Sequence, residues 1–557
     1  ISSGGGVFDR LAKSIQLSDE IKLLTGLGRD RVTPNELIHA LLQSPAELLW
    51  FGGIGTYVKA PQESHADVGD RANDAIRVDA DQLHCQVIGE GANLGMTQAS
   101  RVAFALSGGR VNSDAIDNSA GVDSSDHEVN IKILTAEALR RGTLSQGERN
   151  PLLAQMTEDV ARKVLAHNYA QTGTLTLARS TAGQDHNAHE RLMVYLEGRG
   201  VLDRTIEGLP DTAEMDRRRE AGAPLTRPEL AVLLAWSKIT LFDDLVDSPL
   251  PDDPAFSATL EAYFPAALAQ YPEAMEAHRL RREIIATLIA NRLLDTGGPA
   301  FLQRLREATG AGNAEIARGF EIAQAVLSLG EFETRVAELD TKVDAERQTE
   351  LRAEMATALA RATEWFAVHD THAPVAQVIE RFQSPLDAFK SSLRATASDY
   401  VGARIERHAR ALIRARVPED LARWGAAVGC FARGLPLVPL VLETGMPMEE
   451  VAGTFYRIGD ALRIDRLRDT AEDALAGVAF WDRVATRRQI DDLVALQADV
   501  TRQALEAGGA DAWLEPREDR REDLLDLLRE IGGSQNWTFA KFALSADALR
   551  RFMTAEV

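Results

Sequence analysis

The chain has 557 residues, of which 45% are hydrophobic and 26% charged, and its formal net charge is −22 at pH 7. This is the composition of a globular protein with room for about two to four domains. The acidic balance argues against nucleic acid as the main partner, because phosphate binding needs a basic face.

The first 134 residues alternate short apolar runs with turn residues. Residues 47–51 run into Gly52 and Gly53, and residues 85–88 run into Gly89, so both runs predict strands. A helix is predicted over 97–106 with Thr97 as its N-cap. Arg110 and Val111 can start another short strand. This order predicts a parallel sheet with crossover helices.

Two polar segments follow the predicted strand ends. Residues 89–95 end in glycines, which suit a close approach of the backbone to another group. Residues 117–128 end in Ser125-x-x-Glu128, a pattern that predicts a capping box opening a helix. Two strand ends lying side by side would make a crevice with a free helix N-terminus aimed into it. This pattern indicates an α/β fold and names no ligand.

After Glu128 the pattern is helical almost without interruption. Residues 226–229 form a second capping box, and the apolar stripe over 284–293 stops near Gly297 and Gly298. Residues 247–254 are rich in proline and aspartate and read as a linker. We expect one domain over residues 1–134 and a helical domain over 135–557, which could divide into two subdomains near 247–254.

Candidate site residues each have a structural alternative. Asn93 and Asn118 follow predicted strand ends, where an amide suits a ribose hydroxyl or a carboxamide, yet local pattern alone favours turn-forming roles. Ser125 reads as an N-cap, and the same helix end could bind a substrate carboxylate. His65, Asp67, Asp70 and Asp74 could provide a hard-metal site if the carboxylate oxygens converged, but we interpret these acids as helix-start residues.

The histidines of the sequence do not indicate a metal site, and several motifs that carry known chemistry are missing. His127 can be a base or a ligand, but a lone histidine at a helix start is usually structural. Residues 185–190 lack the spacing of a zinc motif, so we expect no metal site. No glycine-rich dinucleotide turn, P-loop or serine elbow is present in the sequence.

The cellular setting is bounded by a few features of the sequence. Cys85 and Cys430 lie far apart and predict no disulfide framework, which fits a reducing compartment, and we expect a cytoplasmic protein. No apolar run reaches the roughly 18 residues of a membrane span, so we expect no membrane partner. The chain begins at Ile1 without a methionine, which indicates a portion of a longer or processed protein.

The chain resembles the glutamate dehydrogenase superfamily, specifically the very large bacterial NAD-dependent glutamate dehydrogenases. The resemblance runs through the whole chain and is strongest over 48–60, 63–75, 89–98 and 116–133, while 223–231 looks like the helical C-terminal region of the same family. The smaller glutamate dehydrogenases carry E-G-A-N-x-P-T-T and N-A-G-G-V-x-x-S-x-x-E. Those motifs resemble Glu90 to Thr97 and Asn118 to Glu128, with departures at 94–96 and 119–120.

The resemblance implies particular site residues. The cofactor-binding set would be Gly52, Gly53, Glu90, Gly91, Ala92, Asn93 and Asn118, and the substrate-binding set would be Ser125 and Asn118. The lysine and aspartate that act as catalytic residues in the family, and its glycine-rich phosphate turn, are expected upstream of Ile1. We therefore assign no catalytic residue, and neither Lys59 nor Asp67 is promoted to fill the gap.

The implied fold is α/β plus all-α: the C-terminal half of a Rossmann-like dinucleotide-binding domain, then a large helical domain. The implied function is an oxidoreductase that uses NAD to deaminate L-glutamate oxidatively to 2-oxoglutarate and ammonia, as a homo-oligomer. The alternative is a catalytically incomplete fragment whose helices serve oligomerisation or regulation. A weaker alternative is a different dinucleotide oxidoreductase.

Overall fold

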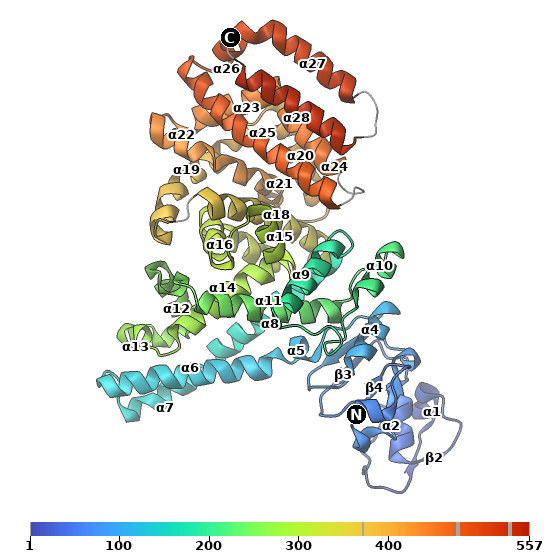
Figure 1. The fold of residues 1–557 in the computed structure, drawn as a ribbon. Helices are drawn as coiled ribbons and strands as arrows, with labels where there is room; N and C mark the ends of the chain where they lie inside the picture. The colour runs from blue at the N-terminus through green and yellow to red at the C-terminus, as the bar shows by residue number, and fades with distance from the viewer. Residues whose placement is uncertain (1, 370–371, 475–479, 533–536, 556–557) are drawn as a thin grey trace. The chain divides into compact units, whose positions relative to one another are not determined.

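The computed structural model describes residues 2–369, 372–474, 480–532 and 537–555. The chain forms two compact units (Figure 1). The first unit comprises Ile1–Asp252 and Phe256–Gln303, and the second comprises Asp253–Ala255 and Arg304–Val557. The predicted domain boundary at 134 lies inside a helix of the first unit, and the domain assignment stays a prediction.

The first unit begins with short strands that pair two by two within the described residues. Strands β1 (Ile15–Gln16) and β2 (Arg31–Val32) are antiparallel. Strands β3 (Leu48–Phe51) and β6 (Val87–Glu90) are parallel, as are β4 (Val58–Lys59) and β5 (Val78–Asp79). The predicted parallel pairing is therefore present, whereas a complete doubly wound sheet is absent from the described residues. The Rossmann-like assignment stays a prediction.

Strand β6 has neighbours on both sides. Its register with β3 runs from Leu48 opposite Val87 to Phe51 opposite Glu90. On its other side Val87 bridges Arg110 in parallel, and the Ile88 N–H donates to the Arg110 carbonyl at 2.9 Å. Helix α4 (Gln98–Leu106) connects β6 to Arg110, with Thr97 as its N-cap as predicted.

The strands and α4 enclose a small apolar core. It is built from side chains that alternate along the strands, together with one face of α4, and burial of each large side chain stabilises the fold by about 1.5–3 kcal/mol. Its main members are Phe51, Val58, Val78, Ile88, Met96, Phe104 and Val111.

The start of the long helix after Asn118 differs from the prediction. A short helix α5 (Asp114–Asp117) is capped by Ser113, and α6 (Ser119–Arg141) follows after a single non-helical residue, Asn118. Ser125 is therefore not an N-cap, and the predicted helix start there is wrong. The buried face of α6 begins at His127, so the Ser-x-x-Glu pattern marks the onset of burial rather than the onset of the helix.

Helices α11 (Arg227–Val246) and α14 (Arg281–Gly297) have the ends that the sequence predicts, and α6 ends at a glycine. Gly142 ends α6 in the left-handed conformation, Thr226 and Glu229 form a capping box, and Gly298 caps α14. The other helices that begin in this unit are α1 (Asp19–Thr25), α2 (Pro34–Leu42), α3 (His65–Val68), α7 (Gln146–Gln155), α8 (Thr157–Thr181), α9 (His186–Gly198), α10 (Thr212–Glu220), α12 (Ser257–Tyr263), α13 (Pro272–Glu276) and α15 (Phe301–Thr309). The predicted linker contains the 3-10 turn Leu250–Asp252.

The described residues of the second unit form helices joined by turns, with no strands among them. Aromatic side chains such as Phe320, Phe366, Phe382 and Phe389 are fully enclosed in it. Near the C-terminus α25 and α28 lie side by side (Figure 1). Its helices are α16 (Asn313–Leu327), α17 (Leu329–Ala337), α18 (Ala345–His369), α19 (Val375–Thr396), α20 (Asp399–Arg414), α21 (Glu419–Phe431), α22 (Leu437–Thr444), α23 (Met448–Ala461), α24 (Ile464–Ala474), α25 (Phe480–Glu506), α26 (Ala510–Leu514), α27 (Glu518–Gly532) and α28 (Phe539–Thr554).

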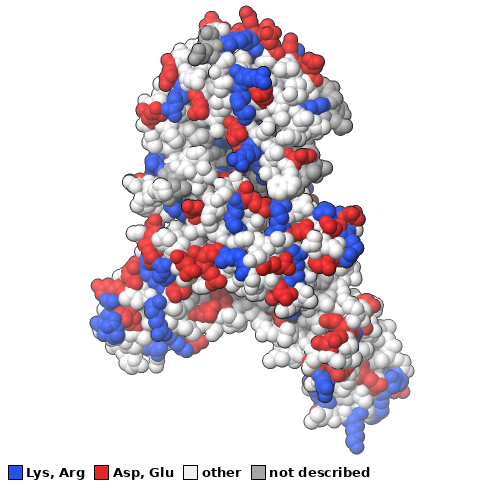
Figure 2. All heavy atoms as spheres, in the orientation of Figure 1, with Lys and Arg blue, Asp and Glu red and all other residues white. Residues whose placement is uncertain are grey.

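Two features bear on partners. Among the described residues no single helix has the length and apolar character of a membrane span, although Glu419–Gly434 and Leu437–Thr444 reach it together across a 59° bend. Figure 2 shows acidic and basic side chains intermixed over the visible face, with no continuous basic patch on the residues drawn there.

Candidate functional site

The carboxyl ends of β3 and β6 meet at one edge of the strand pair. Because Phe51 lies opposite Glu90 in parallel register, Gly52 and Gly53 leave the sheet beside residues 91–93. The segment that bridges β6 at Arg110 runs in the same direction and leads to Asn118 at the same edge. Ligands of open α/β sheets bind at such an edge.

Asn93 and Asn118 are brought together there. The Asn118 Nδ2 amide donates to Asn93 Oδ1 at 2.6 Å, although 25 residues separate the two in sequence. Asn93 is exposed and Asn118 is half-buried. This hydrogen bond uses the Asn118 amide nitrogen and the Asn93 amide oxygen, so Asn93 Nδ2 keeps its donor capacity and Asn118 Oδ1 keeps its acceptor capacity.

Two aspartates hold the loop that carries Asn93. Asp117 Oδ2 accepts from the Glu90 N–H at 3.0 Å and its Oδ1 accepts from Asn112 Nδ2 at 2.8 Å. Burial raises the pKa of Asp117 above its ordinary value, although these hydrogen bonds oppose the shift. Asp114 accepts from the Leu94 N–H at 2.9 Å. Leu94 has φ 60°, a strained value for leucine, so Asp114 stabilises an otherwise unfavourable turn.

Glu90 faces away from this edge. Its side chain is fully buried and accepts from Arg101 Nε at 2.7 Å and Arg101 Nη2 at 2.9 Å. It also accepts from the Met96 N–H at 3.1 Å. Burial raises the pKa of Glu90, and the charge of Arg101 opposes that rise. The carboxylate therefore supports the loop from beneath, and any contact of Glu90 with a cofactor would have to use its main chain.

Trp50 explains two of the glycines. A Cβ placed on Gly89 would lie 2.4 Å from the Trp50 ring, and one on Gly91 would lie 2.6 Å from it. The indole is 59% exposed and covers this part of β6. The close approach predicted for the glycines is thus made by a side chain of the same chain. By contrast, nothing lies within 4 Å of a Cβ on Gly53, so the backbone there is open.

Arg227 ties the edge to the helices of the first unit. From the first turn of α11 its Nε donates to Asn112 Oδ1 at 2.9 Å, and its Nη1 donates to Thr176 Oγ1 on α8 at 2.9 Å. Sequence reasoning missed Arg227, Asp117, Asp114 and Arg101. The one local signal was the capping box at 226–229, which fixes where Arg227 lies on α11.

Ser125 lies apart from the edge. It is exposed on α6, seven residues after Asn118, which a helical rise places about 10 Å further along the axis. The free helix N-terminus expected at Ser125 does not exist. A direct role in binding substrate stays a prediction.

The residues that the sequence assigned to structure have structural partners. Lys59 is buried and pairs with Asp79. Asp67 completes a capping box with Ser64 at the start of α3, which confirms the helix-start interpretation for that acid. In the segment 185–190, His186 contacts the Met215 carbonyl at 2.9 Å through Nε2.

Comparisons with known proteins match nearly the whole chain. Residues 1–178 match the family described as bacterial NAD-glutamate dehydrogenase, catalytic domain, and residues 222–551 match the family described as glutamate dehydrogenase, C-terminal. Three curated proteins named NAD-specific glutamate dehydrogenase are similar. Identity is 38% to that of Halomonas elongata and 40% to that of Pseudomonas aeruginosa, over 99% and 98% of this chain. Identity to that of Mycobacterium tuberculosis is 37% over 88% of this chain.

These matches cover only part of each relative. They span 34%, 34% and 31% of the three proteins, so the chain spans about a third of the length of the curated relatives it matches. The C-terminal family match alone covers more than half of this chain. The resemblance found in the sequence is confirmed: the chain belongs to the bacterial NAD-glutamate dehydrogenase family.

Proposed function

We propose that this chain forms the nicotinamide side of the cofactor cleft in an NAD-dependent glutamate dehydrogenase. The reaction is the oxidative deamination of L-glutamate to 2-oxoglutarate and ammonia. The observation that carries the proposal is the Asn93–Asn118 pair, held at 2.6 Å where β3 and β6 end together. The names of the relatives supply the reaction class.

The residues at this edge fit the nicotinamide end of NAD. A carboxamide has one donor and one acceptor group, and the amide atoms of Asn93 and Asn118 that their mutual hydrogen bond does not use are of complementary types. Gly52, Gly53 and Ala92 present backbone and small side chains, which leave room for a flat ring. Gly91 belongs to the proposed set through its backbone, because a Cβ at this position would lie 2.6 Å from the Trp50 ring.

The residues at the strand ends would each contribute differently to the mechanism. A nicotinamide held beside Asn93 and Asn118 would supply the hydride-accepting chemistry of the reaction. Asn93 and Asn118 orient the acceptor, while Asp114 and Asp117 keep the Asn93 loop in place through main-chain bonds. Ser125 and Asn118 are proposed to contact the substrate. The proton-transferring lysine and aspartate of the family are expected upstream of Ile1, and we assign no such role within this chain.

The proposal extends to the fold of the strand region, the cellular compartment and the oligomeric state. Strands β3 and β6, with the bridge at Arg110, would be the C-terminal half of a Rossmann-like domain, joined through the outer edge of β3 to the phosphate-binding half. The cysteines, Cys85 and Cys430, are buried free thiols, which supports a reducing cytoplasmic setting. We propose a homo-oligomer, as the family resemblance implies, and sedimentation of the full-length enzyme tests it.

The first test removes the amide pair in the full-length enzyme. Asn93→Ala and Asn118→Ala should each lower kcat/KM for NAD about tenfold at saturating glutamate, because one ligand hydrogen bond contributes about 1–1.5 kcal/mol. Asn150→Ala, at an exposed position on α7, is the matched control and should leave kcat/KM unchanged. Unchanged kinetics in both amide variants would contradict the proposal and favour a regulatory role for the chain.

A further inference from the structure

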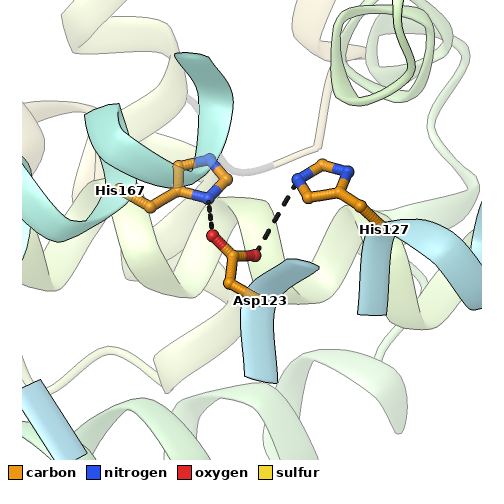
Figure 3. A group of neighbouring side chains, drawn as sticks. All are labelled: Asp123, His127 and His167. Atoms are coloured by element: carbon orange, nitrogen blue, oxygen red, sulfur yellow. Dashed lines mark hydrogen bonds and ion pairs between the residues drawn. The ribbon is translucent and has the colours of Figure 1, made fainter. Parts of the chain in front are cut away.

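A second polar cluster lies between two helices of the first unit, away from the strand ends. Asp123 and His127 are one helical turn apart on α6, and His167 faces them from α8. One ligand-type atom from each of the three side chains lies within 4.8 Å of the others. Figure 3 shows the two imidazole rings on either side of the Asp123 carboxylate.

The distances within the cluster distinguish its two sides. His167 Nδ1 lies 2.8 Å from Asp123 Oδ2, a hydrogen-bond distance. His127 Nε2 lies 3.8 Å from Asp123 Oδ1, which is too long for a hydrogen bond. Two ligands on one tetrahedral zinc ion are about 3.4 Å apart, since each bond is about 2.0–2.2 Å long. The gap between His127 and Asp123 is therefore close to that between two zinc ligands.

His127 is the unusual member. Its side chain is fully buried, and neither ring nitrogen has a hydrogen-bond partner among the described residues. Its ring stacks on Tyr263, with centroids 4.5 Å apart, so the ring is held with Nε2 aimed at the cluster. Buried polar groups are normally satisfied, and an orphan in a native fold calls for an explanation. A bound cation at the cluster would satisfy Nε2.

We propose that Asp123, His127 and His167 bind a zinc ion. Two imidazoles and one carboxylate suit zinc, whereas magnesium and calcium prefer oxygen ligands throughout. The side chains of Asp123 and His167 are 25% and 37% exposed, which leaves an entry path and a fourth position for water. Asp126 adds a negative charge near Asp123, and Lys163 adds a positive charge near His127.

The position of the cluster gives the ion a structural role. Asn168, the residue after His167, donates to the Ile116 carbonyl at 2.7 Å and to Ser119 Oγ at 2.8 Å. These two acceptors flank Asn118. An ion held by both α6 and α8 would thus fix the helix that supports the Asn118 end of the candidate cofactor edge. Zinc binding itself does not depend on the proposed dehydrogenase function.

The sequence showed only part of this arrangement. The spacing of Asp123 and His127 is that of two residues on one helix face, but the third side chain is 40 residues further on. The absence of a metal site was expected from sequence motifs, and the proposed site departs from that expectation.

The test measures zinc binding by the purified 557-residue chain after dialysis against a chelator. Calorimetric titration should give one zinc ion per chain and a raised melting temperature, with no effect of magnesium. Asp123→Asn and His167→Ala should each weaken zinc binding at least about tenfold, since even loss of a supporting residue behind a ligand has that effect. Both side chains are partly exposed, so these variants should fold, which circular dichroism checks. With Co²⁺ in place of zinc, the visible spectrum should be that of a tetrahedral site and should be lost in both variants.

Two matched controls separate a built site from general charge attraction. Asp126→Asn removes one negative charge from the same helix without removing a ligand, and His369→Ala removes an exposed histidine from α18. Both should bind zinc as the unmodified chain does. The proposal is overturned if the unmodified chain shows no saturable binding, if both ligand variants bind zinc normally, or if Asp126→Asn weakens binding as much as Asp123→Asn.

Discussion

At the end of β6, Glu90 places a carboxylate where no water reaches it, and Arg101 lies against it. A buried ion pair contributes little net stability, because desolvation of both charges offsets their attraction. The loss of only one partner, however, strongly destabilises the fold, because the other charge is left buried and unpaired. Glu90 also accepts from the Met96 N–H at 3.1 Å, so the pair fixes both ends of the loop that carries Asn93.

Arg101→Met should therefore destabilise the β6 region by about 3–5 kcal/mol, because it leaves Glu90 buried without its counter-charge. The double variant Glu90→Gln/Arg101→Met should recover much of that loss. Hydrogen exchange of the peptide spanning 87–96, followed by mass spectrometry, measures the local opening free energy. A loss below about 1 kcal/mol in Arg101→Met, typical of exposed pairs, would contradict the buried-pair account.

At this scale the sequence predicted some residues and not others. Asn93 follows the end of β6 as predicted, whereas Asn118 follows helix α5 and not a strand end, so parallel register alone did not predict their hydrogen bond. The orientation of Glu90 was not predictable either, because the strand was expected to end at Ile88. In the structure β6 continues to Glu90, and residues two apart on a strand share a face. Glu90 therefore joins Ile88 in the core.

Among the elements, helices α5 and α6 set the position of Asn118, which lies between them. Ser113 accepts from the Ile116 N–H at 3.4 Å and caps α5, while Ser125 lies inside α6. The two serines are thus predicted to separate stability from function.

Ser113→Ala should lower the stability of the first unit by about 1 kcal/mol, the usual effect of losing an N-cap. Ser125→Ala should leave the melting temperature unchanged, because its side chain caps nothing. If Ser125 contacts substrate as proposed, the same change in the full-length enzyme should raise the KM for glutamate about tenfold or more, since a bond to a carboxylate contributes about 1.5–3 kcal/mol. A lowered melting temperature in Ser125→Ala with an unchanged KM would show that Ser125 stabilises the fold and does not contact the substrate.

Helix ends were predictable where local chemistry sets them. Thr97, Thr226 and Gly142 act within one turn of their own residues, so a short stretch of sequence contains the whole signal. The start of α6 was not, because nothing local distinguishes an apolar face beginning at His127 from a helix beginning there. Contacts such as Arg227 to Asn112 join residues 115 apart and depend on how α11 and α4 pack.

For the whole molecule, the stability of the fold depends on the surroundings of individual charged groups, which the composition alone does not describe. The net charge of −22 favours solubility and opposes compactness, and the visible surface mixes both signs (Figure 2). Stability should depend on pH mainly through carboxyl groups whose surroundings change on folding. Glu364, on α18 in the second unit, is such a group.

Burial and the nearby charge of Asp491 raise the pKa of Glu364 to about 7 from 4.5, against the attraction of nearby arginines. Between pH 4.5 and 7 the folded chain then binds more protons than the unfolded one, so this group lowers stability as pH rises through that range, and the full penalty persists above pH 7. Glu364→Gln should leave the melting temperature unchanged near pH 4.5 and raise it at pH 8. The corresponding gain in the free energy of unfolding at pH 8 is at most about 3 kcal/mol. Because the side chain is only partly buried, water screens the charge and the gain should be smaller. Glu530→Gln, exposed on α27, is the control, and an equal gain at both pH values in Glu364→Gln would show that packing rather than titration is responsible.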